Sequence, residues 1–210
     1  MNLTKIKQIA FNEISEKICW SGEKSEKYYH GERVAKLALT LREYILPGDD
    51  SRDDIITVAG WFHDCAHGQD NHALAGAERA KILLAGHCSD DELREIYDIM
   101  YRHDDRDSDR ALFSDYAKLQ QDADHLDHFG TYIIWRNFVH ASTVGRNIIE
   151  EIADLKEMQE RMPEWGSGLN FDISRKIYRE KSEFYDMFTE RFSVEGTGGI
   201  WNENIIKQVN

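Results

Sequence analysis

The residues of this sequence that could perform chemistry are histidines and an aspartate at the ends of apolar helical faces. His30 lies one turn before an apolar stripe, the pair His63-Asp64 ends the apolar segment IITVAGWF, and His103 ends another stripe. A carboxylate beside such a segment is costly to desolvate unless it is paired or binds a cation. Imidazoles and carboxylates together suit a divalent ion such as manganese, iron, magnesium, zinc or cobalt. The sequence therefore predicts a divalent-metal centre that includes His30, His63 and Asp64.

A metal centre of this composition supports hydrolytic chemistry. A bound divalent ion lowers the pKa of a coordinated water, supplies hydroxide near neutral pH and offsets charge on phosphoryl oxygens. A neighbouring imidazole can then move the proton. The residue types therefore favour hydrolysis by a metal-activated water.

Helices must position these side chains, because the chain has only two prolines and its apolar residues recur at helical spacing. The predicted class is all-α, with a core at about 25–141 and C-terminal helices at about 144–192 packing on it, in one domain over residues 1–210. The expected helices begin near Ser25, Asp53, His72, Ser89, Ser114, Val144 and Phe171, and Gly130 is expected to bend or divide the fifth of them.

Composition narrows the class of partner. The formal net charge of −13 argues against a nucleic-acid polymer, which would require clustered Lys and Arg, but it permits a small phosphorylated substrate in one cleft. No apolar run approaches the roughly 20 residues that span a bilayer. The charged N-terminal segment is unlike a signal peptide, and the three cysteines form no CxxC motif. We therefore expect a cytoplasmic protein with no membrane partner, and both a monomer and a homodimer stay open.

Three segments together resemble the HD superfamily of metal-dependent phosphohydrolases. They are His30, the stretch HDCAHGQDNH from His63 to His72, and DADHLD from Asp122 to Asp127. The resemblance implies an HD-type helical bundle with additional C-terminal helices. It also implies that the metal ligands are His30, the His63-Asp64 pair and the aspartate of the ADxLD segment, which maps onto Asp124. Spacing alone leaves Asp122 as the alternative ligand.

The stretch from His63 to His72 is also similar to the HDxxHGxxxH pattern of deoxynucleoside triphosphate triphosphohydrolases. This similarity implies catalytic roles for His67 and His72 at the phosphate, and His72 also begins a helix whose dipole favours anions. Many small HD proteins carry a carboxylate where this chain has His67, so the general acid or base stays open. By resemblance to LDxxGxxxxxR, Arg136 is expected to bind substrate. The predicted substrate is a nucleotide or a similar small phosphate compound.

Two alternatives to a one-metal phosphohydrolase stay open. His72 and His103 could join His30, His63, Asp64 and Asp124 to hold a second ion, as in HD-type phosphodiesterases and di-iron oxygenases. The chain could also be a helical protein that binds metal without catalysis. The remaining histidines are interpreted as surface or core residues, namely His87, His125, His128 and His140.

Overall fold

The structure, a computed structural model, describes residues 1–17, 22–106 and 108–202. Within these residues the only strand-type pairing is an isolated bridge between Ala85 and Cys88, so the predicted all-α class is confirmed. The helices are α1 (Leu3–Ile14), α2 (Glu26–Ile45), α3 (Asp53–Phe62), α4 (His72–Leu83), α5 (Asp90–Arg102), the short 3₁₀ helix η1 (Arg110–Leu112), α6 (Asp115–Asp127), α7 (Thr131–Val144), α8 (Ile148–Gly166) and α9 (Asp172–Gly196).

Local sequence accounts for several helix ends, since side chains cap the starts of α1, α5, α6 and α8, whereas Ser25 makes no capping hydrogen bond at the start of α2. The predicted capping box at the start of α5 is confirmed, because the Ser89 side chain accepts from the backbone of Glu92 and the Glu92 carboxylate accepts from the backbone of Ser89. Gly130 separates α6 from α7 with a φ of +79°, a conformation that favours glycine.

Both ends of α8 differ from the predicted bounds of about Val144 to Met162. α8 begins at Ile148, because Val144 is the last residue of α7 and Gly145 caps that helix with a φ of +74°. It continues through Pro163 to Gly166, because a proline in the last turn removes only one backbone hydrogen bond.

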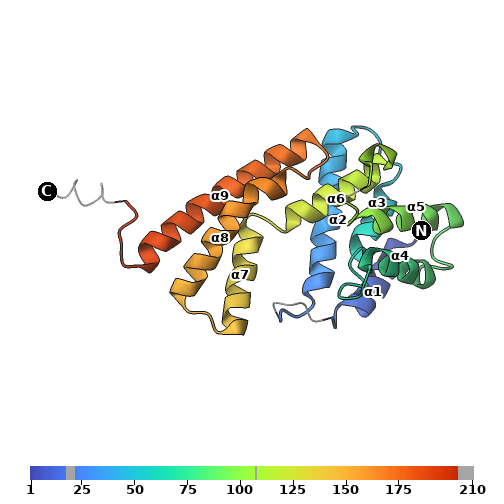
Figure 1. Cartoon of the computed structure of the whole chain (residues 1–210). Helices are drawn as coiled ribbons and strands as arrows, with labels where there is room; N and C mark the ends of the chain where they lie inside the picture. The colour runs from blue at the N-terminus through green and yellow to red at the C-terminus, as the bar shows by residue number, and fades with distance from the viewer. Residues whose placement is uncertain (18–21, 107, 203–210) are drawn as a thin grey trace.

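The helices form two groups (Figure 1). α1 to α6 gather at one end of the molecule, and α7, α8 and α9 lie side by side and extend away from them. α9 contacts both α6 and α2, which joins the groups. One apolar cluster lies mainly among α1, α3, α4 and α5, and a second lies mainly among α2 and α6 to α9. None of the described helices is long and apolar enough to cross a lipid bilayer.

The close crossing of α2 and α3 positions the site. A Cβ atom added to Gly60 would lie 2.7 Å from the Cα atom of Ala35, and one added to Gly31 would lie 2.9 Å from the Gly60 carbonyl oxygen. Glycine at both positions therefore lets the two backbones approach directly. His30 precedes one of these glycines and His63 follows the other by three residues, so the crossing brings the two imidazoles together.

Candidate metal centre

Two buried histidines from α2 and the end of α3 form the centre of the site. The Nε2 atoms of His30 and His63 lie 3.2 Å apart, and each residue is 1% exposed. His63 Nδ1 lies 2.9 Å from the carbonyl oxygen of Gly60, and His30 Nδ1 lies 2.8 Å from Asp127 Oδ2. Since these oxygens can only accept, each Nδ1 carries the hydrogen and each Nε2 can present a lone pair to a cation.

Two carboxylates complete this group. Asp124 Oδ1 lies 3.1 Å from His30 Nε2 and 3.5 Å from His63 Nε2, and Asp64 Oδ2 lies 3.9 Å from both. Oxygen and nitrogen ligands around one octahedral ion at about 2.1 Å lie about 3 Å apart. His30 Nε2 is the common neighbour of the other three predicted ligands, at 3.2 Å from His63, 3.9 Å from Asp64 and 3.1 Å from Asp124, so the four residues gather around one imidazole.

The electrostatics of the site favour a positive charge among these four residues. Burial opposes protonation of His30, but its hydrogen bonds to Asp124 and Asp127 raise its pKa to about 9. Burial also opposes ionisation of Asp64 and Asp124, yet the histidines around them hold the pKa of both carboxyls well below the usual range. A proton on His30 thus occupies the position that a cation would take. The donor set fits the divalent ion that the sequence predicted.

A charged pair outside this group orients His30. Asp127 accepts from His30 through Oδ2 and also accepts from Arg33, whose Nε and Nη2 atoms lie 2.9 Å from its two oxygens. The Arg33 guanidinium stacks on the Tyr132 ring of α7, 3.9 Å from the ring centroid. A carboxylate on the far nitrogen of a ligating histidine fixes the ring and raises its basicity. Sequence analysis missed this role, although Asp127 follows Asp124 by three residues on the same helical face.

The structure separates the two aspartates that spacing left open. Asp122 is fully buried, and its carboxylate accepts from the backbone N–H groups of Asn170 and Phe171 at 2.8 and 3.0 Å. Phe171 immediately precedes α9, so Asp122 anchors the start of that helix. Residues two apart on a helix do not share a face. Asp124 faces the histidines and Asp122 faces α9, so the geometry favours Asp124 as the ligand.

A second group of potential ligands shares Asp64. The Nε2 atoms of His72 and His103 lie 3.2 Å apart, and they lie 3.7 and 4.0 Å from Asp64 Oδ1. His103 Nδ1 lies 2.6 Å from the carbonyl oxygen of Met100, which leaves Nε2 as its acceptor. Asp64 therefore turns one oxygen toward each histidine pair. The residues predicted for a second ion lie together.

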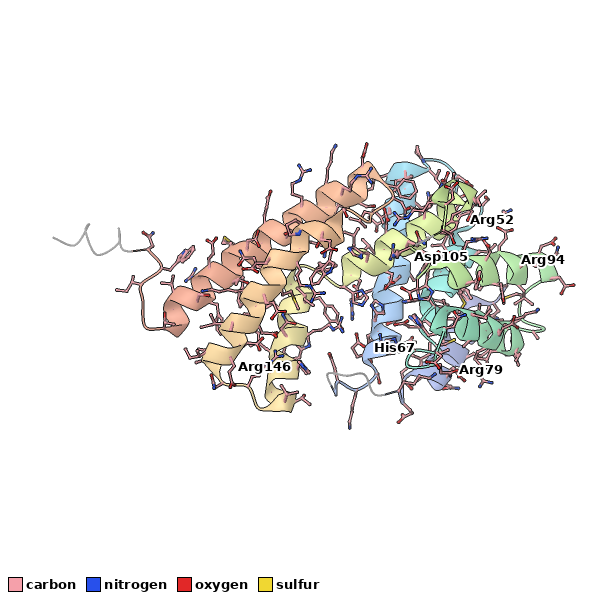
Figure 2. All side chains as sticks on the ribbon, in the orientation of Figure 1. Arg52, His67, Arg79, Arg94, Asp105 and Arg146 are labelled. Atoms are coloured by element: carbon pink, nitrogen blue, oxygen red, sulfur yellow. The ribbon has the colours of Figure 1, made fainter. Side chains whose placement is uncertain are left out.

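The other predicted catalytic residue lies at the solvent side of the site. His67 follows α3 on the loop to α4, and Figure 2 shows it beside the first turns of α2. Its side chain is 42% exposed, and its Nδ1 atom lies 3.7 Å from Asp64 Oδ2. His72 is 25% exposed, whereas His30, His63 and His103 are buried. An incoming substrate would therefore meet His67 and His72 before the buried ligands.

Arg136 and His128 lie on the α6 and α7 side. Arg136 is buried, with its guanidinium carbon 5.8 Å from the centroid of the Tyr132 ring, and its binding of substrate stays a prediction. His128 was interpreted as a surface or core residue, but its ring centroid lies 4.8 Å from that of His30. His128, His30 and Asp124 form another group that could hold a metal ion. The signal in the sequence for this position was its spacing: His128 follows Asp124 by four residues, so the two lie on one face at the end of α6.

Lys27 is a further site residue that sequence analysis did not identify. It lies on α2 one turn before His30, its side chain is 5% exposed, and its Nζ atom lies 2.7 Å from Asp64 Oδ2. A lysine among tyrosines near a helix start carries no motif. Only the packing of α2 against the end of α3 shows that it contacts the central carboxylate.

The arrangement of the helices is similar to that of several bacterial proteins of known structure. An HD-superfamily hydrolase from Bacillus thuringiensis aligns over 93% of this chain and 97% of its own, with a TM-score of 0.70 and 21% sequence identity. YpgQ from Bacillus subtilis, solved in complex with ADP, aligns over 92% and 98%, with a TM-score of 0.66 and 22% identity. This chain therefore has the all-α fold of these two proteins. The fold predicted from the three sequence segments is thus confirmed.

A further structural match is Lin1889 from Listeria innocua. It aligns over 94% of this chain and 99% of its own, with a TM-score of 0.63 and 22% identity. Comparisons with protein-family models and with curated proteins found no match. Because the fold is shared at low sequence identity, it does not determine the chemistry of this chain, which depends on the residues of its own site.

Proposed function

We propose that this chain is a divalent-metal-dependent phosphohydrolase that acts on a nucleotide or a similar small phosphate ester or anhydride. The observation that carries the proposal is the buried convergence of two histidine Nε2 atoms with the carboxylates of Asp64 and Asp124. Two similar structures support it, since one is described as an HD-superfamily hydrolase and the other was solved with ADP.

His30, His63, Asp64 and Asp124 would hold the ion. A divalent ion there would supply Lewis-acid stabilisation of phosphoryl oxygens and a water of lowered pKa. The surrounding residues of the chain would orient these ligands and shield them from solvent. Asp127 and the Gly60 carbonyl fix the tautomers of the two histidines, and burial of His30, His63 and Asp64 limits the access of bulk water to the reacting centre.

His67 and His72 are the proposed acid–base residues. Each combines an imidazole at the exposed side of the site with a position beside Asp64. His72 also begins α4, where free backbone N–H groups and the helix dipole favour an anionic substrate group. Arg136 would add positive charge on the α7 side of the site. It lies close enough to His128 that its charge helps burial to lower the pKa of that histidine. The net-negative protein would thereby hold an anion in one local region.

A two-ion enzyme is the second candidate, and one observation favours it. His72 and His103 repeat the 3.2 Å spacing of His30 and His63, and they face the other oxygen of Asp64. This arrangement would suit a dinuclear phosphodiesterase or a di-iron oxygenase. A helical protein that binds metal without catalysis is the remaining alternative.

Metal analysis of the purified protein, followed by a substrate screen with added Mn²⁺, tests these functions. The phosphohydrolase predicts chelator-sensitive release of phosphate from nucleoside mono-, di- or triphosphates. Iron near two atoms per chain with oxygen-dependent turnover would instead indicate the oxygenase. A protein that neither loses nor gains activity with Mn²⁺ or chelator, on any phosphate compound or phosphodiester, would contradict catalysis by this centre.

A further inference from the structure

The position of Lys27 is unfavourable in two ways. Lys27 is the second residue of α2, and the positive end of a helix dipole disfavours a cation there. Its ammonium group is also buried, which costs desolvation unless a partner compensates. The compensating partner is Asp64, the one carboxylate that faces both histidine pairs. A lysine paired with an acidic residue outside the site would leave the metal centre unaffected, whereas Lys27 pairs with one of the proposed ligands.

Asp64 Oδ2 is the atom that Lys27 and the first histidine pair share. It lies 2.7 Å from Lys27 Nζ and 3.9 Å from the Nε2 atoms of both His30 and His63. A carboxylate oxygen has two lone pairs, so it can accept from the ammonium and also face an ion. The ammonium and an ion held by this group would then be neighbours on one oxygen atom.

We propose that Lys27 is a positioning residue whose fixed positive charge shares Asp64 with the metal and weakens metal binding. This inference rests on the proposed metal centre and adds a residue to it. The charge of Lys27 weakens metal binding in two ways: it repels the neighbouring ion, and it offsets part of the negative charge that Asp64 would otherwise provide. The hydrogen bond from Nζ also fixes the direction in which each Asp64 oxygen points.

The charge of Lys27 can be separated from its hydrogen bond by two substitutions. Lys27→Met removes both, and Lys27→Gln removes the charge but keeps an N–H donor. We expect both variants to bind Mn²⁺ at least about tenfold more tightly than the wild type, because either loses the repulsion. A residue that only held Asp64 in place would give the opposite result, since its loss would weaken binding.

Lys17→Met is the matched control. Lys17 donates to the backbone carbonyl of Cys65, the residue after Asp64, so this variant removes a positive charge near the same segment but not from the carboxylate. We expect it to bind Mn²⁺ as the wild type does.

The experiment is a Mn²⁺ titration of the full chain, followed by the electron paramagnetic resonance signal of free Mn²⁺, with folding checked by circular dichroism. Tighter binding in Lys27→Met and Lys27→Gln, with unchanged binding in Lys17→Met, supports the proposal. Equal or weaker binding in either folded Lys27 variant overturns it while leaving the metal centre intact. A wild-type protein that binds no Mn²⁺ overturns the metal centre and the role of Lys27 together.

Discussion

The two histidine pairs of the site have the same spacing but different surroundings. His30 and His63 are both buried, both have an anchored Nδ1 atom, and both face two carboxylates. His72 and His103 share only one buried carboxylate, that of Asp64; His72 is partly exposed, and its Nδ1 atom also lies 4.0 Å from Oδ2 of the exposed Asp104. Their electrostatics differ as well: the pKa of His30 is raised to about 9 in spite of burial, whereas burial and the nearby His63 lower the pKa of His103 to about 4.

This difference shows that the distance between two histidines does not by itself determine which of two potential metal sites binds an ion more tightly. The number of carboxylates and the anchoring of each imidazole decide how strongly a pair attracts a cation. The first pair should therefore bind an ion more tightly than the second. The second pair is better placed to meet substrate or to hold a weaker ion.

Removal of Asp64 should produce the largest effect, because it is the carboxylate that both pairs share. We expect Asp64→Ala to lose bound metal and at least about 10³-fold in turnover. Metal content and phosphate release measure these losses. Asp70→Ala, on the exposed loop before α4, is the control and should behave as the wild type. An Asp64→Ala protein that is active without metal would contradict the proposed function.

Asp124 and Asp122 should respond differently to the same substitution. Asp124→Asn should lose tight metal binding, since Asp124 contacts both histidines of the first pair. Asp122→Asn should keep the metal but destabilise the protein by about 1–3 kcal/mol, because one of the two backbone N–H groups at the start of α9 then meets an amide NH2 group instead of an acceptor oxygen. Metal binding and thermal denaturation of both variants separate the two roles. Loss of metal in Asp122→Asn alone would reverse the assignment.

Substitution of the second histidine pair should change the rate of catalysis more than it changes the affinity of the first pair for its ion. We expect His72→Ala to lower kcat by about 10- to 100-fold, as for an acid–base residue, with little change in the affinity of the first ion. His63→Ala, in contrast, should lose that ion. Kinetics and Mn²⁺ titration of both variants test the comparison. Equal loss of metal in both variants would show that the two pairs act as one site.

The raised pKa of His30 should make metal binding depend on pH. With a pKa of about 9, His30 holds its proton at neutral pH in the metal-free protein, and an ion must displace it. Mn²⁺ affinity should therefore rise from pH 7 to 9 by about tenfold per pH unit and level off above that. Calorimetry in buffers of different ionisation enthalpy should detect about one proton released per ion. No release at pH 7 would contradict a protonated His30.

The smallest expected effect concerns the residue that supports His30. Asp127→Asn should keep the fold and the four ligands but weaken metal binding by about tenfold, because the histidine loses its charged acceptor. Asp115→Asn, at the exposed start of α6, is the control on the same helix. A Mn²⁺ titration of both variants measures the effect, and unchanged affinity in Asp127→Asn would show that the Asp127 charge contributes nothing.

The sequence by itself determined the all-α class and most of the residues that could bind a metal, with His128 the exception. Apolar periodicity predicted the helices, and the cost of burying Asp64 beside IITVAGWF indicated a cationic partner. His30, His63 and His103 could be identified because each ends or precedes an apolar face, which is a local property of the chain.

Only the tertiary structure decided which of these residues share one point in space. The choice of Asp124 over Asp122, the contacts of Asp127 and Lys27, and the sharing of Asp64 all depend on how α2, α3 and α6 cross. These contacts join residues 37 and 97 positions apart in the chain. Periodicity shows which face of a helix is buried, but not which side chains of other helices that face meets. The direct approach of two backbones at Gly31 and Gly60 is what places the histidines together.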